Sequence, residues 1–265
     1  MLYPKKARFF LCYNLITPRL ARFLNKRTYQ ETLEGLRAYI KRKEKSFRYT
    51  IPRFIQRYGS CGVTSMANAM AVFRPFKFTK KLEKEWLERS LHSPYPGNMP
   101  YLMAEIAREQ GFPVELFWDK ESYLAHTSDS HLEHYAQSSG LPFHLVKEVK
   151  EKFVKGMKEA TNFRGDWNNW VKKRLQEGGL IVFANERQGI LHYNLIYGYD
   201  EEGFFIWDPL GWEEKSSDLN KTMRNSISVW GLVIYDPYLI LAPYILEDAR
   251  AGVAIPGRLS GKKDC

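Results

Sequence analysis

The chain has 265 residues, of which 44% are hydrophobic and 15% aromatic. This composition is sufficient for a sizeable core and excludes a mainly disordered protein. Charged or turn-forming residues interrupt every apolar run well before the roughly 18 residues that a membrane-spanning helix requires, so we expect no such helix. The cysteines form no CxxC pair, which argues against a disulfide framework or a cysteine zinc site and favours a reducing compartment. They are Cys12, Cys61 and Cys265.

The net charge of +10 is concentrated at the start of the chain. Residues 1–50 contain 13 lysines and arginines against three glutamates, whereas the two signs balance in the remainder. We therefore expect a basic N-terminal arm over residues 1–48, partly helical, with a charged helix over residues 28–45. The arm fits an anionic membrane surface or an acidic partner, or packs as a charged helix on the rest of the protein; nucleic acid is the least favoured partner. The expected location is cytoplasmic, and membrane-peripheral if the arm binds lipid.

After the arm, the pattern predicts a globular domain over residues 49–245 and a tail over residues 246–265. Pro52 and Gly59 bracket an extended segment ahead of the first helix of this domain. Apolar residues then recur at three- and four-residue steps, which predicts a helix over residues 61–73 with one buried face. The apolar positions of this face are Val63, Met66, Ala67, Met70 and Phe73.

The rest of the domain predicts helices first and strands second, an order typical of an α+β fold. Helices are expected over residues 79–91, 98–110, 147–158 and 168–176, with one short strand over residues 112–118. Further strands are expected over residues 180–184, 191–199, 204–207, 229–235 and 238–242. A tight turn signal at residues 200–203 predicts an antiparallel hairpin between the second and third of these strands.

Residues 119–146 are polar and weakly patterned. Three histidines of this stretch lie near an aspartate: His126, His131 and His134, with Asp129. These match no strong zinc spacing, so we expect a solvated loop and no metal site. Trp167 and Trp170 lie three residues apart on a predicted helix, a spacing that favours packing over a role in a binding groove. No nucleotide-binding glycine loop or calcium-loop spacing is present, so no cofactor is expected.

Cys61 follows a glycine-containing loop and stands at the first turn of a predicted helix. The unpaired N–H groups and partial positive charge of a helix N-terminus favour the thiolate form of a cysteine, which is the form that attacks. A packing cysteine more often lies on the apolar face, which other residues of this helix already occupy. Cys61 is therefore a candidate nucleophile, with a small buried residue at a helix start as the alternative.

A nucleophilic cysteine needs a base, and the base needs a group that orients it. His192 lies in an otherwise apolar and aromatic strand, where a titratable ring is costly unless it has partners. Asp208 ends the next strand, and a hairpin brings the two strands side by side. Asn194, two residues from His192 on the same strand face, is a second candidate for the orienting group. The alternatives are a core histidine bonded to backbone and an aspartate that starts a turn.

Gln56 lies five residues before Cys61. Its side-chain amide can point to the same place as the Cys61 backbone N–H, and the two donors would then form an oxyanion hole. The alternative for Gln56 is a plain surface glutamine.

Gln56, then Cys61 with a following glycine at a helix start, and a late His192 in an aromatic strand with Asp208 after it form one pattern. It resembles the bacteriocin-processing, double-glycine-type cysteine peptidases of the papain-like superfamily. The resemblance covers roughly residues 50–240 and implies a papain-like α+β fold, with the nucleophile's helices packed on a C-terminal antiparallel sheet. It also implies that Cys61 attacks with His192 as the base. Asp208 would orient His192, and Gln56 would stabilise the oxyanion.

We therefore expect a thiol hydrolase that cleaves a peptide or amide bond through an acyl-enzyme on Cys61, with a peptide or protein as its substrate. One alternative keeps this acyl-enzyme and passes the acyl group to an amine, as an acyltransferase or transglutaminase-like enzyme does. A second alternative is a catalytically silent papain-like domain that binds a peptide in its cleft. The chemistry of the first two needs neither a cofactor nor a metal.

Overall fold

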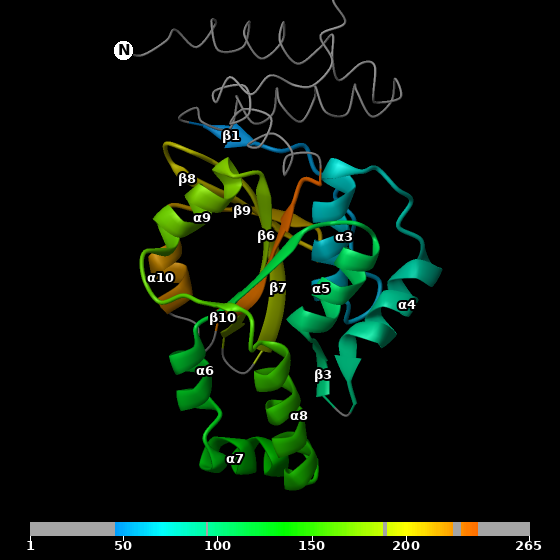
Figure 1. The fold of residues 1–265 in the computed structure, drawn as a ribbon, viewed down its shortest axis with the longest axis vertical. Coiled ribbons are helices and arrows are strands. Elements are labelled where there is room, and N and C mark those ends of the chain that lie inside the picture. The colour runs from blue at the N-terminus through cyan, green and yellow to red at the C-terminus, as the bar shows by residue number, and fades with distance from the viewer. Residues whose placement is uncertain (1–45, 94, 188–189, 225–228, 238–265) are drawn as a thin grey trace, which may run out of the picture. The chain divides into compact units, whose positions relative to one another are not determined.

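The computed structural model describes residues 46–93, 95–187, 190–224 and 229–237 (Figure 1). They all belong to one compact unit, Lys41–Pro237. Most of the basic arm, the helix expected over residues 28–45, the strand expected over residues 238–242 and the tail lie outside the described residues. Among the described helices, none is long and apolar enough to cross a membrane.

The main sheet is built largely from the second half of the described chain. Along it the strands follow the order β5, β4, β10, β6, β7, β8, β9, and β1 pairs with β7. Only the β4–β5 pair is parallel among these described pairs. The strands are β1 (Phe47–Arg48), β4 (Val114–Trp118), β5 (Thr161–Asn162), β6 (Gly179–Arg187), β7 (Ile190–Asp200), β8 (Gly203–Asp208), β9 (Trp212–Ser216) and β10 (Val229–Tyr235).

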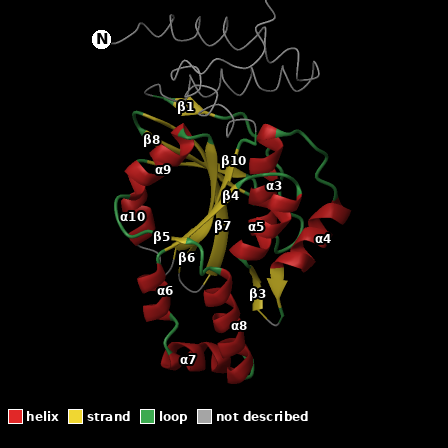
Figure 2. Cartoon of the chain, viewed as in Figure 1, coloured by secondary structure: helices red, strands yellow, loops and turns green. Residues whose placement is uncertain are grey.

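Helices cover the sheet on two sides (Figures 1 and 2). On one side lie α3 (Cys61–Phe73), α4 (Lys80–Ser90) and α5 (Pro100–Glu109), and on the other lie α9 (Trp167–Gln176) and α10 (Leu219–Arg224). A third group projects beyond one end of the strands: α6 (Lys120–His126), α7 (Asp129–Ser139) and α8 (Phe143–Gly156). The α+β fold that the sequence predicts is therefore confirmed.

The hairpin predicted at residues 200–203 is confirmed as the connection of β7 to β8, with Asp200 paired to Gly203 at its tip. The predicted packing role of the two tryptophans is confirmed as well. Trp167 and Trp170 are buried, and their rings contact that of Phe117.

The helix α3 has the bounds that the sequence predicts, but its burial is more extensive. Residues 62–71 are all buried, because the sheet, α4 and α5 surround the helix. Gly62 is required by this packing: a Cβ at that position would lie 2.7 Å from the side chains of both Asn98 and Met103. The nucleophile candidate Cys61 thus begins a helix that is held on every side.

The solvated loop predicted over residues 119–146 is wrong, because α6, α7 and the start of α8 occupy it. Local signals that the weak periodicity obscured explain these helices. Asp119 caps α6 by accepting the Ser122 N–H, and Gly140 ends α7 in the left-handed conformation. Leu132 and Ala136 then pack against Val146 of α8 in a small core of their own.

The other differences concern short elements that the sequence pattern did not indicate. A hairpin of β2 (Leu91–His92) and β3 (Tyr95–Asn98) separates α4 from α5, where two helices were expected to follow more closely. The strands β1, β5 and β9 and the helix α10 were also not predicted. Such elements are stabilised mainly by pairing with distant strands, which local periodicity does not report.

Candidate active site

Three elements bring the candidate catalytic residues together. Cys61 is the first residue of α3, His192 is near the start of β7, and Asp208 is the last residue of β8. In the β7–β8 register Leu195 pairs with Trp207, so that Asp208 lies beside the His192 end of β7. Because α3 packs on β7, Cys61 lies near His192 although it belongs to the other half of the chain.

The ring of His192 is bonded to Asp208, with 2.9 Å between Nε2 and Oδ1. Asp208 is buried, and the same Oδ1 accepts the Leu210 N–H at 2.7 Å. The Asp208 carboxylate therefore does two things: it starts a turn by accepting the Leu210 N–H, and it bonds the His192 ring. Asn194, the other candidate for the orienting group, pairs across the sheet with Phe183 of β6.

Cys61 interacts with the same ring through a hydrogen bond and through charge. Burial opposes a charge on His192, but hydrogen-bond and charge interactions with Cys61 and Asp208 outweigh it and raise the pKa of His192 to about 9. Since Nε2 is taken by Asp208, Nδ1 is the ring nitrogen left for the thiol. The interactions with Cys61 and with the Asp208 carboxylate therefore favour the imidazolium form of His192.

The loop before Cys61 is held by a buried carboxylate that sequence reasoning missed. Glu83 of α4 is fully buried. Its Oε1 accepts the Arg57 backbone N–H at 2.7 Å and the Ser60 hydroxyl at 2.6 Å, and its Oε2 pairs with the Arg57 guanidinium at 2.7 Å. One signal could have revealed it: Glu83 stands three residues before the buried Trp86, on the same helical face.

Gln56 is partly buried at the edge of the site. Its backbone N–H donates to the Pro209 carbonyl at 2.9 Å, which ties the residue to the segment that follows Asp208. Its Oε1 is buried without a hydrogen-bond partner in the described part of the chain. Gln56 therefore lies on the Asp208 side of the site and is not a plain surface glutamine.

Asn98, at the end of β3, supports the first turn of α3 and was also missed. Its Oδ1 accepts the Gly62 N–H at 3.0 Å, and its Nδ2 donates to Ser90 at 2.7 Å. Its carbonyl accepts the Tyr193 hydroxyl at 2.8 Å. One residue thus connects the helix of Cys61 to the strand of His192.

His126 on α6 and His131 and His134 on α7 stand apart from this arrangement. The ring of His126 bonds the Ser122 carbonyl, and that of His131 bonds the Ser128 hydroxyl. Within the described ranges, no group of three or more histidine, cysteine or carboxylate side chains is arranged to hold a metal ion.

Comparison with known proteins gives one family. The model of the Peptidase_C39 like family matches residues 48–233, which is more than half of the chain and includes every residue of the site described above. No curated protein matches the chain.

Proposed function

The chain belongs to the Peptidase_C39 like family, a group of cysteine peptidases with a papain-like fold, and we propose that it cleaves a peptide or amide bond through an acyl-enzyme on Cys61. The observation that carries this proposal is the ring of His192 between Cys61 and Asp208, with its pKa raised to about 9. A base fixed between a nucleophile and a carboxylate is the arrangement that thiol acyl transfer requires.

In the proposed reaction, His192 takes the proton of the Cys61 thiol, and the sulfur attacks the substrate carbonyl carbon. When the tetrahedral intermediate collapses, the carbon–nitrogen bond breaks and His192 returns the proton to the leaving amine. Water, deprotonated by His192, then attacks the thioester and releases the acid and the free thiol. The roles assigned to Asp208 and Gln56 are the orientation of His192 and the donation of a hydrogen bond to the oxyanion.

The test is the rate at which iodoacetamide alkylates Cys61 as a function of pH, measured by mass spectrometry on the full chain. Cys12 and Cys265 serve as internal controls. We expect Cys61 to react selectively well below pH 8.5, near which a free cysteine ionises, and the His192→Ala variant to lose this advantage. A Cys61→Ala variant should keep its fold and lose all turnover.

Two results would contradict the proposal. If all three cysteines react alike, the site holds no activated thiol, and the silent peptide-binding domain becomes the better description. If Cys61 is selective but His192→Ala leaves its rate unchanged, the helix N-terminus alone activates the thiol and His192 is not its partner.

A further inference from the structure

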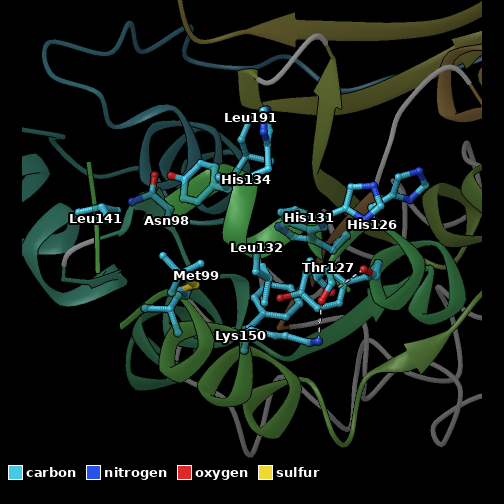
Figure 3. Close-up of a pocket in the computed structure, with 16 residues that line it drawn as sticks. Asn98, Met99, His126, Thr127, His131, Leu132, His134, Leu141, Lys150 and Leu191 are labelled. Carbon is cyan, nitrogen blue, oxygen red and sulfur yellow. Dashed lines mark hydrogen bonds between the residues drawn. The ribbon is translucent and has the colours of Figure 1, made fainter. Parts of the chain in front are cut away.

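The three helices beyond the sheet end, α6, α7 and α8, enclose a pocket together with the strand ends and Asn98 (Figure 3). Its volume is about 380 Å³. This is within the range of sites that bind small ligands or side chains. Neither Cys61 nor His192 lines the pocket.

Two separate apolar cores meet at this pocket without filling it. From the main core come Tyr123, Phe153 and Trp230, whose rings contact one another. From the small core of α7 and α8 come Leu132 and Val146. Apolar surface left open between two packed cores is costly in water, and a site that binds an apolar group is its usual explanation.

The charge of the wall is one-sided. No aspartate or glutamate is among the described residues that line the pocket, whereas Lys150 is. The Lys150 ammonium donates to the Thr127 carbonyl at 2.6 Å, which keeps the positive charge at the wall (Figure 3). A ligand that carries lysine or arginine side chains into this space would meet like charge without a carboxylate to compensate it.

The pocket adjoins the candidate active site through two residues of its wall. Leu191 directly precedes His192 in β7. Asn98 accepts the Gly62 N–H, next to Cys61, and also the Tyr193 hydroxyl, next to His192. The wall of the pocket and the candidate active site thus share Asn98 and the start of β7.

We infer that the pocket binds an apolar segment, free of lysine and arginine, of the peptide that Cys61 cleaves. This inference rests on the proposed function and specifies its substrate class. The segment lies against Trp230 and Phe153, with Lys150 in the same wall.

The experiment compares two reagents that alkylate cysteine with loss of chloride: acetyl-Leu-Leu-Gly and acetyl-Lys-Lys-Gly chloromethyl ketones. Their rate constants at Cys61 are measured on the full chain by mass spectrometry. We expect the leucyl reagent to react about tenfold faster or more, because a buried leucine side chain gains about 1.5–3 kcal/mol. Equal rates would overturn the inference.

Val149→Trp fills the pocket from α8 and should bring the ratio of the two rate constants close to one. Glu151→Trp, on the exposed face of the same helix and outside the pocket, adds the same ring and should leave the ratio unchanged. Circular dichroism checks that Val149→Trp is folded. If it is not, the Lys150→Glu variant tests the inference in its place. It should lower the ratio about threefold or more by favouring the lysyl reagent, and an unchanged ratio would contradict the inference.

The controls separate this inference from the proposed function. Iodoacetamide carries no side chain, so its selective reaction with Cys61 depends on the activated thiol alone. Selective iodoacetamide reaction with no preference between the two peptide reagents would overturn the pocket and leave the proposed function standing. A further control is the binding of sodium dodecanoate. If dodecanoate binds the pocket and the two peptide reagents react at equal rates, the occupant is a free fatty acid, and the inference that the pocket binds a peptide segment is overturned.

Discussion

The ring of His192 is stabilised in its charged form by Asp208 of the next strand and by Cys61 from a distant part of the chain. Burial alone would lower its pKa, yet Cys61 and Asp208 raise it to about 9, above the ordinary value of 6.5. A pKa raised in the folded state contributes stability that is fully present below pH 6.5 and is lost as the pH rises through about 9. In the proposed reaction, the imidazolium that would protonate the leaving amine is thus available across neutral pH.

We expect the titration midpoint of His192 to fall in the Asp208→Asn variant, because the substitution removes one of the two groups that raise its pKa. The midpoint is measured by NMR on histidine-labelled protein, with His192→Gln to assign the signal. It should be about 9 in the unsubstituted chain and clearly lower in the variant. An unchanged midpoint would mean that Asp208 does not determine the charge of His192.

At the scale of the elements, the position of Cys61 depends on α4 as much as on α3. Ser60 precedes the helix, but its hydroxyl does not cap it, because that hydroxyl is bonded to Glu83. The same carboxylate holds the backbone and the side chain of Arg57. A single buried acid on one helix thus determines the path of the loop that begins the next.

Glu83→Gln should loosen this loop, because the amide cannot accept all three hydrogen bonds and its NH₂ group would face the Arg57 guanidinium. We expect the free energy of unfolding to fall by about 1–3 kcal/mol and the alkylation of Cys61 to slow. Urea unfolding and the iodoacetamide rate measure the two effects.

Glu109→Gln is the matched control, since it removes an exposed ion pair between Glu109 of α5 and Arg89 of α4. It should change both quantities little. If the two variants have the same alkylation rate, Glu83 has a structural role only.

At the scale of the whole molecule, the described unit contains a large core and a small one. The large core joins the sheet to the helices on both of its sides. The small core joins α7 to α8 through three buried side chains, which are Leu132, Ala136 and Val146. Because so little apolar surface holds α7, this helix should open without the rest of the protein.

Hydrogen exchange measured by mass spectrometry at increasing urea should show this difference. Peptides of α7 are expected to exchange at lower urea than peptides of β6 and β7, whose residues lie in the large core. Identical urea dependence in the two regions would show that the pocket helices and the sheet unfold as one unit.

The sequence by itself determined the features that depend on neighbouring residues. The apolar period after Cys61 predicted α3 with its observed bounds, and the turn at residues 200–203 predicted the β7–β8 hairpin. Together with the residue types, the hairpin also placed His192 near Asp208, as the structure has them. These features were predictable because helical periodicity and turn chemistry act within a few residues.

Only the tertiary structure decided the contacts between distant segments. Glu83 reads as an ordinary helical charge until its carboxylate meets the loop before Cys61, and Asn98 reads as a helix start until it bonds Gly62. Two further features depend in the same way on segments far apart in the sequence. They are the position of β10 between β4 and β6 and the pocket lined by α6, α7 and α8. Burial and hydrogen-bond partners are properties of the packed chain, so no local pattern reports them.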